Sequence, residues 1–188
     1  MYSRACTRAS ELGFEQRIRV WRIELILAAA KVGIMIRTVA DLEFELHCDV
    51  LERQSMESAM DRLAPLFENA SGERSALFLV SPNAGSATAL RFWADAQTTS
   101  VAFANPELFP WCLANAPCAA LARRFGITGP NFTWLGDEEA LQAASSAAEY
   151  TLKQGRVECA FVVSVCFGRR GVPGCLRVWC MRNLPDKF

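Results

Sequence analysis

The stretch GPNFTWLGDEEALQAASSAAEYTLKQG, residues 129–155, carries the clearest structural signal in the chain. Residues 131–135 predict a short strand, and a helix is predicted to begin at Asp137 and to run to about Lys153. Asp137 is a favourable N-cap residue, and the two glutamates after it suit the first turn of a helix. The helix body is small and nearly uncharged, which is typical of a helix buried between other layers.

Strands and helices alternate on both sides of this stretch. Apolar runs bounded by turn residues predict further strands at 75–81, 157–165 and 175–181. Helical spacing predicts further helices at 49–68, 87–96 and 111–125. Pro65 should end or kink the first of these helices, and Gly126 and Gly155 should stop the helices before them. The alternation predicts an α/β fold with a largely parallel sheet, in which the last strand can run antiparallel.

The size of the chain fits one structural domain. It has 188 residues, of which 52% are hydrophobic. Residues 1–48 form a divergent N-terminal segment: 1–17 read as a polar arm or loosely held helix, and 20–30 fit either a strand or a helix. The apolar run at 25–30 is far shorter than the ~20 residues of a membrane span. The chain start lacks a signal-peptide pattern, so we expect a cytoplasmic protein.

The charges balance, with 20 Lys plus Arg against 20 Asp plus Glu. A neutral chain lacks the basic excess of a dedicated nucleic-acid-binding protein, so no nucleic-acid partner is expected. The mean hydropathy of +0.13 is high and predicts either a large core or an apolar surface that meets a partner.

The cysteines do not predict a metal site or a cofactor. No pair has CxxC spacing, and His47 is the single histidine. Without a sign of export, the cysteines are expected to be reduced and to act as small buried apolar residues. They are residues 6, 48, 112, 118, 159, 166, 175 and 180.

Three motifs in residues 115–165 stand out, and they can be placed in one register without inserting gaps. They are NAPCAALARRFG from Asn115, GPNFT from Gly129 and LKQGRVECAFVV from Leu152. Together they resemble the β-ketoacyl synthases, the condensing enzymes of fatty-acid and polyketide synthesis, and best the divergent ketoacyl-synthase-like N-terminal domains. The similarity covers roughly residues 50–181, so 49–188 is identified as such a half domain. It implies half of a thiolase-like unit, with a five-stranded, mixed and mostly parallel sheet and helices on both faces.

The resemblance places Glu138 where a working synthase has its nucleophilic cysteine, the tenth residue counted from Gly129. Condensing enzymes need a thiol there, at the N-terminus of a buried helix that lowers its pKa. They also need two further residues, histidines in the fatty-acid type, from a second half of the fold that this sequence does not contain. We therefore expect no active condensing enzyme.

Glu138 leaves two interpretations open. Some family members carry glutamine at this position and serve as decarboxylases or as chain-length factors, and a protonated glutamate in a dry pocket would resemble glutamine. The Gly-Asp-Glu-Glu run is also an ordinary helix start, worth ~1 kcal/mol of stability. We favour the ordinary helix start over a catalytic role.

The first functional hypothesis is a non-catalytic, chain-length-factor-like protein of fatty-acid, polyketide or aryl-polyene-type biosynthesis. It would act as a homodimer, or as a heterodimer with a complete ketosynthase, and acyl carrier protein is a further implied partner. The resemblance implies an interface formed by residues Asn115, Asn131, Phe132, Thr133 and Trp134.

Two other hypotheses remain. The chain could be a decarboxylase or hydrolase acting on acyl-carrier thioesters, with Glu138 assisted by Asn115 or Thr133. It could also be a degenerate remnant with no activity.

Other candidate residues have simpler interpretations. Cys112 and Cys118 flank the first motif, but no histidine accompanies them, so packing is favoured over a nucleophilic role. Residues 82–87 read as a turn, because the lysine of a phosphate-binding loop is missing. Arg169 and Arg170 either meet an acidic carrier protein or are simply solvated, and the second reading is favoured.

Overall fold

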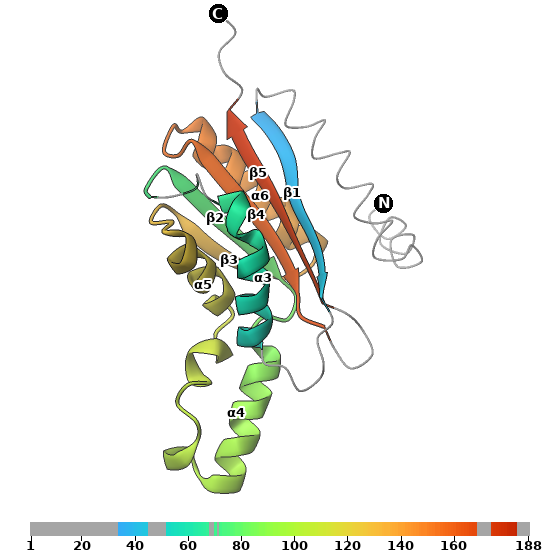
Figure 1. Cartoon of the computed structure of the whole chain (residues 1–188), viewed down its shortest axis with the longest axis vertical. Coiled ribbons are helices and arrows are strands. Elements are labelled where there is room, and N and C mark those ends of the chain that lie inside the picture. Colours follow the sequence, from blue (N-terminus) through green and yellow to red (C-terminus); the bar gives the residue numbers. More distant parts are fainter. Residues whose placement is uncertain (1–33, 45–51, 68–69, 71, 169–173, 184–188) are drawn as a thin grey trace, which may run out of the picture.

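The computed structural model describes residues 34–44, 52–67, 70, 72–168 and 174–183 (Figure 1). Its centre is a five-stranded sheet with the order β1-β5-β4-β2-β3. The strands are β1 (Ile34–Phe44), β2 (Ser75–Ser81), β3 (Asn131–Leu135), β4 (Cys159–Cys166) and β5 (Gly174–Asn183).

The strand directions confirm the predicted mixed sheet. β2 pairs in parallel with both β3 and β4. β5 runs antiparallel to β4 and to β1, so it alone is reversed. β2 is buried along its whole length, because it lies between two strands and under helices on both faces.

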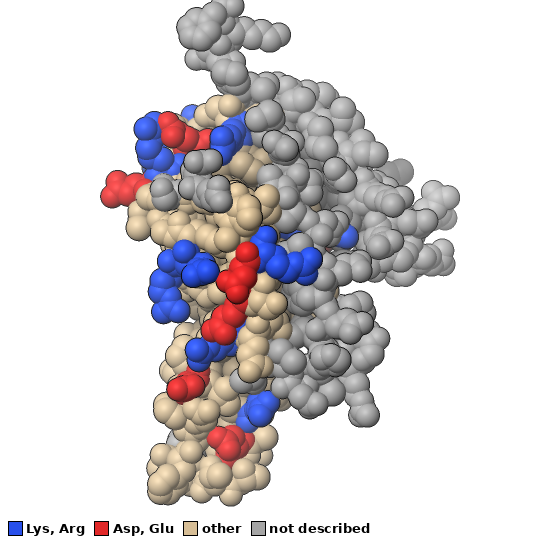
Figure 2. Space-filling model, in the orientation of Figure 1, with Lys and Arg blue, Asp and Glu red and all other residues tan. Residues whose placement is uncertain are grey.

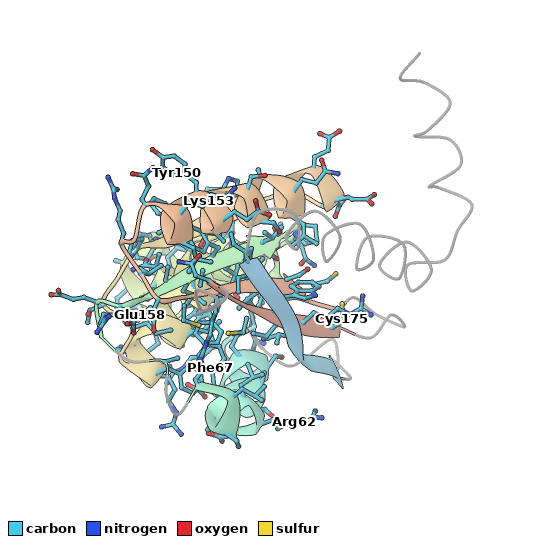
Figure 3. All side chains as sticks on the ribbon, turned by 90° about the horizontal axis from the view of Figure 1, so that it is seen from above. Arg62, Phe67, Tyr150, Lys153, Glu158 and Cys175 are labelled. Atoms are coloured by element: carbon cyan, nitrogen blue, oxygen red, sulfur yellow. The ribbon has the colours of Figure 1, made fainter. Side chains whose placement is uncertain are left out.

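Helices cover both faces of the sheet, as predicted. The α-helices are α3 (Glu52–Phe67), α4 (Ser86–Thr99), α5 (Ala116–Phe125) and α6 (Glu138–Lys153). Two short 3₁₀ helices lie between α4 and α5, η1 (Val101–Phe103) and η2 (Phe109–Cys112). Figure 3 shows α6 and α3 on opposite sides of the sheet, with Phe67 pointing toward the strands and Tyr150 pointing away.

The larger core lies between the sheet and the α3–α5 layer. Phe67 stacks on Phe125 with ring centroids 4.3 Å apart and contacts Phe161 at 4.5 Å. Phe67 belongs to the last turn of α3, so the helix continues two residues past Pro65. Burial of Phe67, which is 2% exposed, favours helical backbone through the proline that was expected to end or kink it.

The α6 face holds the smaller core. Ala144, Ser145, Ala148 and Leu152 lie against the strands. The opposite side of α6 is exposed, with Tyr150 at 60%. The expectation of a buried α6 is therefore met on only one side of the helix in this single chain.

The predicted helix at 111–125 is wrong in its first part. Residues 109–112 form η2, the backbone is extended at Leu113, and α5 begins only at Ala116, after Asn115 as N-cap. Pro117 in the first turn is the physical reason, since proline suits the start of a helix and not its interior.

The N-terminal region contributes one strand that the sequence did not place. β1 pairs with β5 at the edge of the sheet and lies within the segment 1–48. Several predictions lie outside the described residues. They concern the polar segment 1–17, the 20–30 element, His47, Cys6, Cys48, Arg169 and Arg170.

Candidate functional site

A sharp turn joins β3 to α6 at the carboxyl end of the parallel strands. Gly136 has φ of +142°, a conformation that favours glycine, and its N–H donates to the Ser81 carbonyl oxygen at 3.1 Å. Asp137 occupies the N-cap position, and Glu138 is the first residue of α6. The structure thus places Glu138 at a strand-to-helix turn.

The environment of Glu138 leaves its catalytic role untested. Its side chain is half-buried, and within the described part of the chain it has no hydrogen-bond or ion-pair partner. Asp137 makes no side-chain capping bond either, although the sequence favoured it as a cap. General acid–base chemistry needs a partner that orients and tunes the carboxyl group. A chemical role for Glu138 stays a prediction.

The two proposed assistants of Glu138 lie on the other side of the sheet. Asn115 is exposed at the start of α5 and makes no side-chain capping bond. The Thr133 hydroxyl is buried on the face of β3 that meets α5. Because α5 and α6 cover opposite faces, neither residue shares a helix layer with Glu138.

The predicted interface strand β3 is an edge strand. It pairs only with β2, and it is the last strand in the sheet order of the described residues. Phe132 and Leu135 are 55% and 62% exposed. Edge strands leave a row of backbone groups that can pair with another chain, and soluble proteins normally cover or charge such edges. This edge carries apolar side chains instead.

Aromatic residues join the β3 edge to the α6 face. The Phe132 and Trp134 rings lie 5.9 Å apart, and each lies about as close to the ring of buried Phe78. Beside them, α6 exposes Ala143, Ser146 and Tyr150. We call this set, β3 with the outward side of α6, the β3–α6 surface. Small residues let another layer approach closely.

Sequence reasoning missed one buried carboxylate, which accepts three hydrogen bonds. Glu52, at the start of α3, is 2% exposed. Its oxygens accept hydrogen bonds from the Gly85 N–H at 2.9 Å, the Ala87 N–H at 3.1 Å and the Thr88 hydroxyl at 3.2 Å. Glu52 therefore binds the N-terminus of α4, where the helix dipole favours negative charge.

The sequence of residues 82–87 predicts a turn and not a phosphate-binding loop. The Glu52 contact agrees with that interpretation, because its carboxylate occupies the place at the N-terminus of α4 where a bound anion would lie. Burial raises the pKa of Glu52, against the smaller lowering effect of its hydrogen bonds. Burial, and then the Glu52 charge, raise the pKa of nearby Cys112. Glu52 lies near the start of the helix predicted at 49–68, but its hydrogen-bond partners lie 33 to 36 residues later in the sequence. A local pattern therefore could not predict the contact.

A second pair of hydrogen bonds fixes the turn between β2 and α4 to the sheet. The Asn83 side-chain amide donates to the Phe167 carbonyl at 2.6 Å and accepts from the Phe167 N–H at 3.0 Å. Asn83 thereby acts as an extra strand residue at the end of β4. The base of α4 is held by both β4 and α3.

Of the six described cysteines, three are buried and three are half-buried. Cys118 is 2% exposed, and burial raises the pKa of its thiol to about 11. The thiols of Cys159 and Cys180 lie 3.2 Å apart within the core. A thiol with a raised pKa is a poor nucleophile at neutral pH, so packing is the better account of Cys118.

Over the described ranges, no three residues among His, Cys, Asp and Glu gather in a way that could hold a metal ion. In the same part of the chain, none of the helices combines the length and apolar character needed to cross a membrane.

Comparisons with known proteins support the fold. No protein-family model and no curated protein sequence matches the chain. Among solved structures, it is similar to the ishigamide ketosynthase/chain length factor, with a TM-score of 0.55 and 18% identity over 63% of this chain and 38% of that chain.

It is also similar to the ketosynthase ApeO in complex with its chain length factor ApeC from Xenorhabdus doucetiae. Here the TM-score is 0.54 and the identity 11%, over 73% of this chain and 64% of that chain. The chain thus spans less than two thirds of either neighbour. These likenesses establish a ketosynthase-like, thiolase-type fold and confirm the predicted fold class.

Proposed function

We propose that this chain is a non-catalytic β-ketoacyl synthase-like protein, similar in role to a chain-length factor. It acts by associating with another subunit of the same fold in fatty-acid, polyketide or aryl-polyene-type biosynthesis. The observation that carries the proposal is Glu138 at the first residue of α6, directly after the β3 turn. The names of both structural neighbours include a chain length factor, which supports this role.

The chemistry of Glu138 argues against condensation. A glutamyl carboxylate could accept an acyl group only as a mixed anhydride, which water would cleave readily. An ionised Glu138 would also repel a malonyl carboxylate. Cys118 is no substitute, because its thiol is buried and its pKa is raised to about 11.

The β3–α6 surface supports association. An edge strand with exposed Phe132 and Leu135 offers both backbone pairing and apolar contact. We propose that this surface meets the partner, either a second copy or a complete ketosynthase. We place the assembly in the cytoplasm, where the reduced cysteines that the sequence predicts are the default.

A decarboxylase or hydrolase remains the second candidate, because the side chain of Glu138 is only half-buried. Its carboxylate is therefore open to a substrate. This candidate predicts turnover that depends on Glu138, whereas the first predicts none.

Incubation of the full chain with malonyl-acyl carrier protein separates the two candidates. The experiment measures CO₂ release and the loss of the thioester, with Glu138→Ala and Asp137→Ala as matched variants. We expect no turnover above the protein-free rate in any sample. Turnover that disappears in Glu138→Ala and persists in Asp137→Ala would overturn the non-catalytic proposal in favour of the enzyme.

A further inference from the structure

A second apolar surface lies outside the β3–α6 surface. Residues 86–113, which comprise α4, η1, η2 and their connections, project beyond the end of the sheet (Figure 1). We call this segment the arm. It carries five of the eight large hydrophobic side chains that are exposed in the described residues. They are Leu90 at 72%, Trp93 at 59%, Phe103 at 80%, Phe109 at 58% and Leu113 at 52%.

The arm is nearly free of charge. Arg91, Asp95 and Glu107 are its three charged residues in a stretch of 28. Figure 2 shows the projecting part as mainly uncharged surface, whereas the body above it carries bands of acidic and basic side chains. A large uncharged apolar surface on an isolated protein is typical of a protein–protein contact.

The arm is held in one shape by its own contacts. The rings of Phe92 and Phe109 lie 5.9 Å apart, and they join α4 to η2. The Asp95 carboxylate accepts a hydrogen bond from the Asn105 N–H at 3.0 Å and so closes the returning loop. A preorganised surface loses little conformational entropy when it binds.

The base of the arm is equally fixed. Glu52 binds the first turn of α4, and Gly85 packs against the backbone of η2. A Cβ atom at Gly85 would lie 2.7 Å from the Cys112 carbonyl oxygen, so the two ends of the arm touch there. These contacts fix the direction in which the arm projects from the sheet.

The β3–α6 surface alone is small for a stable interface. Phe132, Leu135 and Tyr150 expose on the order of 350 Å² of side chain, whereas a standard interface covers about 800 Å² on each partner. The five exposed side chains of the arm add roughly 600 Å². The two surfaces together reach the area that a stable dimer needs.

The two surfaces adjoin. Leu113 ends the arm and leads into α5, where the Cys118 thiol donates to the Phe132 carbonyl oxygen at 3.5 Å. At the other end of β3, Leu135 is the register partner of Ser81, which immediately precedes the turn into α4. One partner can therefore cover both surfaces.

We propose that the arm is a dimerisation element that packs on a second copy of this chain, as an extension of the β3–α6 contact. This inference rests on the proposed function, since it assigns the partner of the same edge. The charge of the chain is compatible with a second copy as the partner. Because its formal net charge is zero, two copies have no net electrostatic repulsion. A two-fold axis would let each copy present the same strand edge and the same arm to its mate.

Sedimentation velocity of the full chain between ~1 and ~100 μM tests the proposal. The variants are Leu90→Ser/Trp93→Ser/Phe103→Ser in the arm and Phe132→Ser/Leu135→Ser in β3, with Arg62→Ser on the outward side of α3 as control. All these residues are exposed, so folding should persist, and circular dichroism checks it. We expect a dimer for the unchanged chain and the control. The dissociation constant should rise roughly 100-fold or more in the arm variant, because apolar anchors dominate interface energies.

The outcomes separate the two proposals. A monomer at the highest concentration would overturn the dimer inference, and the malonyl-acyl carrier protein assay would still test the proposed function. A dimer that the β3 variant disrupts and the arm variant leaves intact would assign the contact to the β3–α6 surface alone and overturn the role of the arm.

Discussion

Two of the strand-to-helix turns, both within the described residues, lie at the same end of the sheet, and the helices that follow them are placed in opposite ways. Both turns contain a glycine with positive φ, Gly85 at +80° and Gly136 at +142°. After Gly136, α6 folds back onto the strands and buries four residues. After Gly85, α4 projects away and buries only Thr88 and Ala96.

The difference follows from long-range contacts rather than from the turns themselves. The N-terminus of α4 is bound by Glu52 from another helix, and its turn is tied to β4 through Asn83. The N-terminus of α6 has only local acidic residues, and its position is set by small residues that fit the sheet. A helix with little apolar contact to the core is thus fixed by polar anchors at its base.

Removal of the Glu52 carboxylate should have the largest effect. Glu52→Ala leaves three donors at the start of α4 without their acceptor, and we expect a loss of about 3 kcal/mol in the free energy of unfolding. Urea denaturation measures it. Glu57→Ala, on the exposed side of the same helix, is the control and should change stability by less than about 0.5 kcal/mol. Equal effects of the two variants would contradict a structural role for Glu52.

Substitution of alanine for Gly85 and for Gly136 should lower the free energy of unfolding by different amounts. At Gly85 a Cβ would meet the backbone oxygen of Cys112 at 2.7 Å, so we expect Gly85→Ala to cost about 2 kcal/mol. At Gly136 the nearest contact is the Ala140 Cβ at 3.1 Å, and Gly136→Ala should cost about 1 kcal/mol, mainly for the positive φ. Thermal or urea unfolding compares them. A larger loss at Gly136 would reverse the comparison.

The Glu52 contact should also give a smaller, pH-dependent effect. The pKa of Glu52 is raised above its ordinary value of 4.5, mainly by burial, so the folded state holds the proton more tightly than the unfolded state. This contribution is fully present below about pH 4.5 and is lost as the pH rises through the raised pKa. Subtraction of the Glu52→Gln pH profile from that of the unchanged chain isolates it. A difference that grows with rising pH would contradict the sign.

The first residues of α6 should matter least. An N-cap aspartate typically contributes about 1 kcal/mol through its side-chain bond, but Asp137 makes no such bond. We expect Asp137→Ala and Glu138→Ala each to change the free energy of unfolding by less than about 0.5 kcal/mol. Urea denaturation of both variants is the measurement. A loss near 1 kcal/mol at either position would indicate an active cap, as the sequence first suggested.

Local signals were sufficient for the central elements. The uninterrupted apolar runs of β2 and β4 predicted strands buried on both faces, and the small-residue segment predicted α6 nearly to its ends. Gly126 and Gly155 stop their helices with positive φ, as expected. These features depend on neighbours in sequence, so a single chain reveals them.

Features that depend on distant partners were not predicted. The strand β1 is defined by its pairing with β5, more than a hundred residues later. The burial of Glu52 depends on donors in α4, and the continuation of α3 past Pro65 depends on Phe125 and Phe161. The late start of α5 is different, because the sequence contained its signal. Pro117 favours a helix start at that point, but the run of small residues led to a prediction that the helix begins at residue 111.

Association through the β3 edge and the arm should protect the backbone amides of both segments. Hydrogen–deuterium exchange of the full chain at low and high protein concentration tests it most directly. We predict that amides of residues 131–135 and of the arm gain protection as the concentration rises, while those of α3 stay unchanged. Protection that is independent of concentration at both β3 and the arm, or a gain confined to α3, would contradict the account.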